Sequence, residues 1–200
     1  MYKVNRMIII GITGTLGAGK GTIVDYLVRE EGFDHYSVRE FLLAEMKKLG
    51  MPENRDSMTS LANRLRAAYG PSYIIDHLYD KAREGMHDCV IESIRTPGEV
   101  QSLRRKQDFY LFAVDATPEK RYKRIIKRGT ETDGVSLREF KSNEAREMIS
   151  DDPNKQNISK CIDMADYAFR NDGKINELLN KVARVMAEIR KDIADGKRKE

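Results

Sequence analysis

Apolar residues along this chain gather in five short runs, and more polar stretches with helical periodicity separate them. The runs cover residues 7–12, 33–37, 88–92, 109–114 and 165–169. Short, nearly continuous apolar runs are typical of strands that are buried on both faces of a sheet. The clearest are 7–12, which is Met-Ile-Ile-Ile-Gly-Ile, and 109–114, which is Phe-Tyr-Leu-Phe-Ala-Val. We therefore predict five strands.

Between these runs, apolar residues recur every three or four positions, as in amphipathic helices. Residues 37–84 hold three such stretches, which are broken at Met51-Pro52 and at Gly70-Pro71. Further helical stretches lie at 97–106, 117–128, 137–149 and 175–193. This alternation favours an α/β fold, in which helices cover both faces of a mainly parallel five-stranded sheet. The segment 37–84 is then an insertion above the carboxyl ends of the strands, where ligands bind in such folds.

Composition and net charge limit the classes of binding partner that we expect. Hydrophobic residues make up 40% of the chain and charged residues 34%, and the net charge of +4 is too small to favour nucleic acid. No apolar run approaches the roughly 20 residues that span a bilayer, and residues 1–6 are too polar for a signal peptide. Cys89 and Cys161 form no metal motif. We expect a cytoplasmic monomer or small homo-oligomer that binds neither membranes nor nucleic acid.

A glycine-rich loop joins the first predicted strand to the first predicted helix. Residues 14–22 read Gly-Thr-Leu-Gly-Ala-Gly-Lys-Gly-Thr. Strand, glycine loop and helix form the context of a phosphate-binding P-loop, because glycines let successive N–H groups surround an anion at the positive end of the helix. The residues predicted to bind ATP here are Gly14, Thr15, Gly17, Ala18, Gly19, Lys20, Gly21 and Thr22.

Two side chains of this loop have expected chemical roles. Lys20 supplies a positive charge for the β- and γ-phosphates, and Thr22 offers its hydroxyl to Mg²⁺. In the general P-loop pattern the hydroxyl follows the lysine directly, whereas Gly21 intervenes here, so the contact of Thr22 with the metal stays open. The alternative explanation of the whole loop is a glycine-rich turn without a ligand.

The ending Gly19-Lys20-Gly21-Thr22 resembles that of adenylate kinases and related nucleoside monophosphate kinases. Other segments recur in the same order in P-loop kinases of the nucleoside monophosphate kinase-like and dephospho-CoA kinase-like groups. They are Val-Ile-Glu-Ser-Ile-Arg at 90–95, Thr117-Pro118 before a basic helix, Ala-Asp-Tyr at 165–167 and Asn-Asp-Gly at 171–173. The resemblance covers most of residues 7–190. It implies a three-layer α/β/α P-loop fold, ATP and Mg²⁺ as cofactors, and small nucleotide substrates.

The resemblance also assigns roles to residues that follow the strands. Glu92 takes the place of an acid that holds Mg²⁺ through water, unless it is a plain surface acid. Arg95 takes the place of an arginine that clamps the acceptor phosphate, a task that suits the planar guanidinium group.

Ser37, Arg39 and Glu40 follow the second strand, where nucleotide kinases carry a Ser/Thr-x-x-Asp stretch and a later arginine that binds the acceptor phosphate. Glu40 takes the place of the acid, and because Leu43 occupies the later position, either Arg39 substitutes for the arginine or the contact is lost. Glu40 is either a base toward a hydroxyl acceptor or a solvent-facing helix acid.

Arginines in the predicted helices complete the implied site. Arg64 in the insertion either reaches the acceptor phosphate or lies on an exposed face, and Arg66 has the same two explanations. Residues 124–146 resemble a lid that supplies charge to the transferring phosphoryl group, with Arg128 and Arg146 as its candidate arginines. A solvated basic face is the alternative for both.

The loop after the last predicted strand carries Asn171 and Gly173, which border the donor adenine in the resembled kinases. A plain turn would use the same residues.

We interpret residues 1–200 as one P-loop kinase domain with an acceptor-binding insertion at 37–84, a small lid at 124–146 and a flexible tail at 196–200. The expected reaction moves the γ-phosphoryl group of ATP to a small phosphorylated acceptor, preferably a nucleoside or deoxynucleoside monophosphate. The expected catalytic residues are Lys20, Glu92, Arg128 and Arg146. A dephospho-CoA kinase and a non-catalytic nucleotide-sensing domain remain the alternatives.

Overall fold

A computed structural model describes residues 6–106, 108–129 and 136–197 and contains one five-stranded sheet. Its strands are β1 (Ile9–Gly14), β2 (Asp34–Ser37), β3 (Cys89–Glu92), β4 (Phe109–Asp115) and β5 (Tyr167–Arg170). The spatial order is β2-β3-β1-β4-β5, and every neighbouring pair is parallel. The predicted five-stranded α/β architecture is therefore confirmed, with strand ends shifted by one or two residues.

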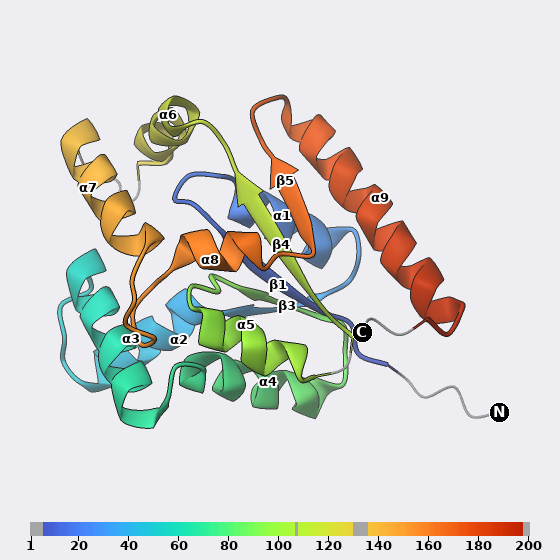
Figure 1. The fold of residues 1–200 in the computed structure, drawn as a ribbon, viewed down its shortest axis with the longest axis horizontal. Helices are drawn as coiled ribbons and strands as arrows, with labels where there is room; N and C mark the ends of the chain where they lie inside the picture. Colours follow the sequence, from blue (N-terminus) through green and yellow to red (C-terminus); the bar gives the residue numbers. More distant parts are fainter. Residues whose placement is uncertain (1–5, 107, 130–135, 198–200) are drawn as a thin grey trace.

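Helices connect the strands and lie on both sides of the sheet (Figure 1). They are α1 (Lys20–Arg29), α2 (Val38–Lys48), α3 (Arg55–Tyr69), α4 (Tyr73–Gly85), α5 (Pro97–Arg104), α6 (Pro118–Arg128), α7 (Leu137–Met148), α8 (Ile158–Asp163) and α9 (Ile175–Ala194). Local sequence explains several starts. The side chains of Ser37 and Asn54 cap α2 and α3, and Thr96 forms a capping box with Glu99 at the start of α5.

Two apolar clusters cover the two faces of the sheet. β1 contributes to both, because Ile10 and Ile12 point into one cluster while Ile9 points into the other. The first cluster packs α1 and α9 against the sheet, and the second packs α2, α3, α4, α5 and α8. Figure 1 shows α1 and α9 on one side, with α4, α5 and α8 on the other. The helices of the predicted insertion thus share a core with the strands.

The carboxyl ends of the strands meet at one edge of the sheet. Ser37, Glu92 and Ile12 lie side by side on β2, β3 and β1, and the glycine loop follows β1 at this edge. Side chains that are far apart in the sequence are therefore gathered next to the loop. In the described part of the chain, none of the helices is both long and apolar enough to cross a membrane.

Candidate active site

The glycine loop adopts the strand–turn–helix geometry that the sequence predicts. Gly14, Gly17 and Gly19 all have positive φ angles, of 137°, 78° and 110°. A side chain at Gly14 is sterically impossible, since its Cβ would lie 2.0 Å from the carbonyl oxygen of Val114. Gly19 precedes α1, and no side chain of the described residues caps this helix. The first turn of α1 therefore presents its positive end to the loop.

Lys20 folds back onto the loop. Its Nζ atom donates hydrogen bonds of 2.9 Å to the carbonyl oxygens of Gly14 and Thr15. Removal of the ammonium group from water, followed by the positive charge of Arg95, lowers the pKa of Lys20 to about 7. The lysine is thus held close to the backbone groups that would surround a phosphate.

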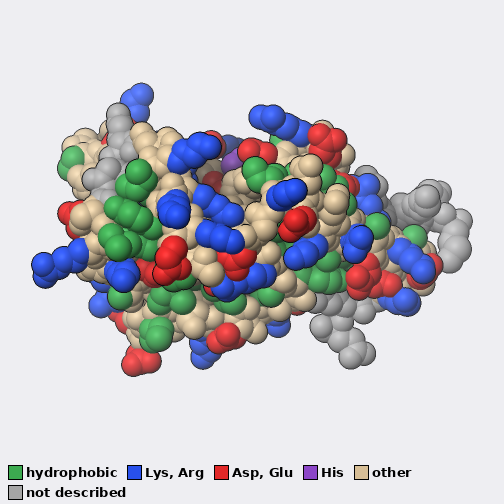
Figure 2. Space-filling model, turned by 90° about the horizontal axis from the view of Figure 1, so that it is seen from above, with side chains coloured by type: hydrophobic (Ala, Val, Ile, Leu, Met, Phe, Trp, Pro, Cys, Tyr) green, Lys and Arg blue, Asp and Glu red, His purple; other side chains and the backbone are tan. Residues whose placement is uncertain are grey.

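A cavity of about 590 Å³ opens beside the loop. Residues of the loop, α2, α3, α6 and the end of β3 line it, and Figure 2 shows basic side chains gathered around a hollow in this face. The predicted site residues that line it are Gly17, Gly19, Lys20, Gly21, Thr22, Arg39, Glu92, Arg95, Arg128 and Asn171. The structure therefore places donor-side and acceptor-side candidates around one cavity.

Glu92 ends β3 and lines this cavity. Its Oε1 atom accepts a hydrogen bond of 3.0 Å from Ser37 Oγ and lies 3.6 Å from His35 Nε2. Burial alone raises the pKa of Glu92, but the close polar contact with His35, the hydrogen bond from Ser37 and the charges of His35 and Lys20 hold that pKa below its usual value. Glu92 is therefore an anion next to Lys20.

The side-chain oxygens of Thr22 and Glu92 are the candidates for contact with a magnesium ion in this cavity. Both residues line the cavity with Lys20. Among the described residues, no group of three or more His, Cys, Asp or Glu side chains could hold a metal on its own. In proteins, Mg²⁺ usually keeps several waters and is bound by substrate phosphates with only one or two protein oxygens.

Around Arg95, a predicted acceptor-binding residue, the cavity contains a carboxylate that sequence reasoning missed. Glu147 of α7 pairs through Oε1 with Arg55 Nη2, and through Oε2, at 2.7 Å, with Arg95 Nη1. Arg95 Nη1 also donates a 2.7 Å hydrogen bond to Gln156 Oε1. Three regions that are far apart in the chain supply these groups, namely Arg55, Arg95 and the stretch 147–156, and Arg55, Glu147 and Gln156 belong to no local motif. No sequence pattern could have identified them.

The two arginines of α3 have different positions. Arg64 is exposed and lies outside the cavity lining, whereas Arg66 is buried, lines the cavity and pairs with Glu99 at 2.8 Å. Spacing alone does not separate the two, because Arg64 lies three residues after the buried Leu61 and Arg66 four residues after the buried Ala62.

The remaining candidates spread around the cavity. Arg128 at the end of α6 lines it, whereas Arg146 is exposed and contacts Asn143 and Asp56. Glu40 is exposed and lies outside the lining, and so does Gly173. Residues 130–135, the tip of the predicted lid, lie outside the described residues, as do 198–200 of the predicted tail.

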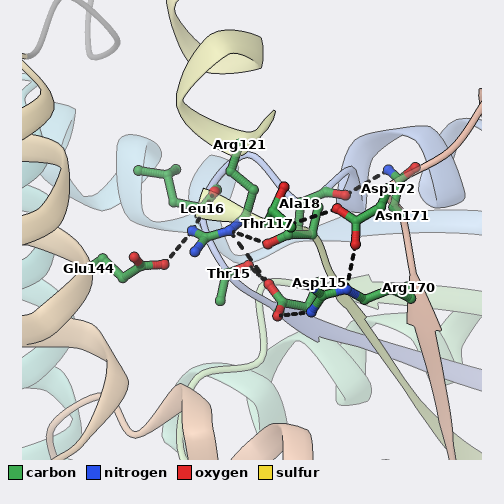
Figure 3. Close-up of polar contacts among 12 residues, drawn as sticks. Thr15, Leu16, Ala18, Asp115, Thr117, Arg121, Glu144, Arg170, Asn171 and Asp172 are labelled. Atoms are coloured by element: carbon green, nitrogen blue, oxygen red, sulfur yellow. Dashed lines mark hydrogen bonds and ion pairs between the residues drawn. The ribbon is translucent and has the colours of Figure 1, made fainter. Parts of the chain in front are cut away.

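A buried network connects α6 with the glycine loop (Figure 3). Arg121 is 4% exposed and donates hydrogen bonds to the carbonyl oxygens of Ala116 and Leu16, and it pairs with Glu144 of α7. Asn171 Nδ2 donates a 2.8 Å hydrogen bond to the carbonyl oxygen of Ala18. The loop is thus held from the outside by side chains of α6 and of the segment after β5.

Comparison with known proteins agrees with this architecture. The family model described as the AAA domain matches residues 10–149, which is more than half of the chain. A UPF0200 protein of Thermococcus sibiricus is 28% identical over 183 residues, which cover 88% of this chain and 93% of that protein. A UPF0200 protein of Methanothermobacter thermautotrophicus is 29% identical over 188 residues, which cover 92% of this chain and 93% of that protein.

Solved structures of small-molecule kinases share the fold. A gluconokinase from Sinorhizobium meliloti superposes with a TM-score of 0.60 at 12% identity and covers 96% of this chain and 99% of its own. A shikimate kinase from Bacteroides thetaiotaomicron superposes with a TM-score of 0.58 at 12% identity, and the match covers 91% of this chain and 99% of that protein. The expected kinase-like P-loop fold is confirmed by these likenesses. Because the family match runs from β1 through the glycine loop to the end of α7, the chain belongs to the AAA domain family.

Proposed function

We propose that this protein is an ATP-dependent phosphotransferase whose acceptor is a small phosphate monoester, a nucleoside or deoxynucleoside monophosphate. The observation that carries the proposal is that Lys20 and Thr22 line the same cavity as Arg55 and Arg95. A donor phosphate on the loop and an acceptor phosphate on the arginines would then meet inside one enclosure, which is what in-line transfer requires.

The donor side supplies charge and oriented backbone groups. Lys20 would leave the carbonyl oxygens of Gly14 and Thr15 for the β- and γ-phosphates, and the N–H groups of the loop would hold them. Thr22 and Glu92 would hold Mg²⁺, which neutralises charge on the phosphates when it is bound. Arg128 would add a further positive charge from the rim.

The acceptor side favours an anion with an apolar body. The guanidinium groups of Arg55 and Arg95 share the carboxylate of Glu147, which leaves one net positive charge for a phosphate. The wall beside them is apolar and suits the carbon skeleton of a base or sugar, with lining residues Val38, Leu42, Met58 and Ala62. A phosphate acceptor needs no general base, because its attacking oxygen is already an anion.

Acceptor-dependent turnover tests the proposal. Formation of ADP would be followed by a coupled assay with ATP, Mg²⁺ and one acceptor at a time: ribo- and deoxyribonucleoside monophosphates, dephospho-CoA, shikimate and gluconate. We expect turnover with at least one monophosphate. Lys20→Ala should abolish it while the melting temperature stays near that of the wild-type protein, because the lysine contacts only the loop's carbonyl oxygens among the hydrogen bonds of the described residues.

The acceptor that supports turnover distinguishes the proposal from its alternatives. Turnover with dephospho-CoA alone would assign the other kinase class, and turnover with shikimate or gluconate alone would refute a phosphorylated acceptor. Tight ATP binding without any acceptor-dependent ADP formation would identify a nucleotide sensor. Wild-type rates in Lys20→Ala would remove the loop from the chemistry altogether.

A further inference from the structure

Glu147 occupies an unusual place for a carboxylate, because it lies among the cations of a site suited to anions. It lines the cavity, its side chain is 10% exposed, and each of its two oxygens binds a different arginine. Burial alone raises the pKa of Glu147, but the charges and hydrogen bonds of Arg95 and Arg55 outweigh burial and lower it. The carboxylate is therefore ionised and fixed between the two guanidinium groups.

The bridge leaves most of the arginine donors available. A guanidinium group has five N–H donors in a planar fork. Among the described residues, the hydrogen bonds of Arg55 use Nη2 only, and the side-chain bonds of Arg95 use Nη1 only. Each arginine thus keeps further donors that a phosphate could accept while Glu147 stays in place. Gln156 fixes Arg95 from a second direction.

We propose that Glu147 is a positioning residue, which holds Arg55 and Arg95 at the spacing that a phosphate monoester needs. The inference rests on the proposed function and deepens it, since it names a dianionic phosphate as the group that the acceptor presents. Arg55 begins α3, Arg95 follows β3 and Glu147 belongs to α7. The carboxylate of Glu147 therefore links α7 to α3 and to the segment after β3, and it fixes the distance between the two guanidinium groups. A guanidinium without such an anchor would have to lose side-chain freedom when the acceptor binds.

The opposite role for Glu147 makes an opposite prediction. If the carboxylate merely competed with the acceptor for the arginines, its neutralisation would free them and tighten acceptor binding. In Glu147→Gln the amide oxygen can accept from one arginine, but the amide NH₂ group faces the other one without an acceptor. A positioning role therefore predicts weaker acceptor binding, although the variant adds one net positive charge to the site.

The experiment compares wild type, Glu147→Gln and Glu139→Gln. Glu139 lies on the same helix, outside the cavity lining, in a capping box with Ser136 that glutamine can also form. Calorimetry with AMP, CMP, GMP and UMP would measure monophosphate binding, and steady-state kinetics would measure the KM for acceptor and for ATP. For Glu147→Gln we expect acceptor affinity to fall about tenfold or more, which is the value of one charged hydrogen bond, with the KM for ATP within about twofold of wild type.

The outcomes separate the two proposals. Tighter or unchanged monophosphate binding in Glu147→Gln would overturn the positioning role, and so would a wild-type protein that binds no phosphate monoester. Equal losses for acceptor and ATP would also overturn it, because they indicate a general structural defect. A third outcome is that Glu147→Gln binds monophosphates more weakly than the wild-type protein, but the wild-type protein shows no turnover. This result would support the positioning role and refute the phosphotransferase proposal. Glu139→Gln should behave as wild type throughout.

Discussion

At the scale of single residues, the protonation state of the Lys20 amine should depend on whether a phosphate is bound. The ammonium is removed from water and lies near Arg95, and both effects favour the neutral amine, with a pKa of about 7 against 10.5 for a free lysine. Between pH 7 and 10.5 the unfolded chain binds the proton more strongly than the folded chain does, so the contribution of Lys20 to stability increases with pH in this window. A bound phosphate reverses the preference, because it stabilises the ammonium form.

We therefore predict that ATP binding takes up a proton at Lys20. At pH 8 the uptake should approach about one proton, and it should shrink at pH 6, where the lysine is already charged. Calorimetric titration in two buffers with different ionisation enthalpies would measure it, with Lys20→Ala as the control that lacks this uptake. Equal proton uptake by the wild-type protein and Lys20→Ala at pH 8 would contradict the depressed pKa.

The ion pair between Arg66 and Glu99 concerns stability rather than protonation. The side chains are 1% and 0% exposed, and Glu99 also accepts hydrogen bonds from the backbone N–H groups of Arg95 and Thr96. Removal of one partner leaves the other charge buried and uncompensated, which costs about 3–5 kcal/mol. Arg66→Ala should thus lower the free energy of unfolding by about that amount, as urea titration would measure.

Arg64→Ala is the matched control for this prediction. Arg64 lies on the exposed face of the same helix, so its replacement should change the free energy of unfolding by less than about 0.5 kcal/mol. Similar losses in the two variants would mean that Arg66 and Glu99 gain little from their pairing.

At the scale of elements, α6 and α7 approach the cavity unequally. Arg128, the last residue of α6, lines the cavity, whereas the Arg146 side chain on α7 is 61% exposed and contacts Asp56. An arginine that reaches the transferring phosphoryl group contributes on the order of 10³ or more to kcat. We predict that Arg128→Ala lowers kcat far more than it weakens ATP binding, and that Arg146→Ala has the smaller effect of the two.

Steady-state kinetics of both variants with a turned-over acceptor would measure this difference. A larger loss of kcat in Arg146→Ala would reverse the order, and wild-type kcat in both would place these arginines on a solvated face.

Elements with strong local patterns were predictable, and those without them were not. The strands and the glycine loop follow from contiguous residues, since apolar runs and glycine spacing are local signals. Helix α8 was missed because its six residues are too few to show a helical period. Glu147 and Gln156 were missed for a different reason. Both residues contact Arg95 only in the folded chain, where α7 and the segment after it approach the end of β3, and no local sequence pattern indicates these contacts.

At the scale of the whole molecule, the two apolar clusters are joined through the sheet. Phe112 of β4 is fully buried on the side of α1 and α9, where its ring lies 5.3 Å from that of Phe169. Leu61 of α3 is buried in the other cluster, within the predicted acceptor-binding insertion. Because β1 contributes side chains to both clusters, loss of packing on one face should weaken the other.

We predict that Phe112→Ala lowers the free energy of unfolding by about 3–5 kcal/mol and Leu61→Ala by about 2–5 kcal/mol, each in one cooperative transition. Urea titrations followed by far-ultraviolet circular dichroism and by tyrosine fluorescence would measure it, since the chain has nine tyrosines and no tryptophan. Leu49→Ala is the control, because Leu49 is 57% exposed and its removal leaves no cavity. Two separate transitions, with Leu61→Ala shifting only one, would show that the insertion folds as a unit of its own. Coincident transitions would instead extend the cooperative unit across the cavity, so that arginines from α3 and the glycine loop after β1 belong to one folded body.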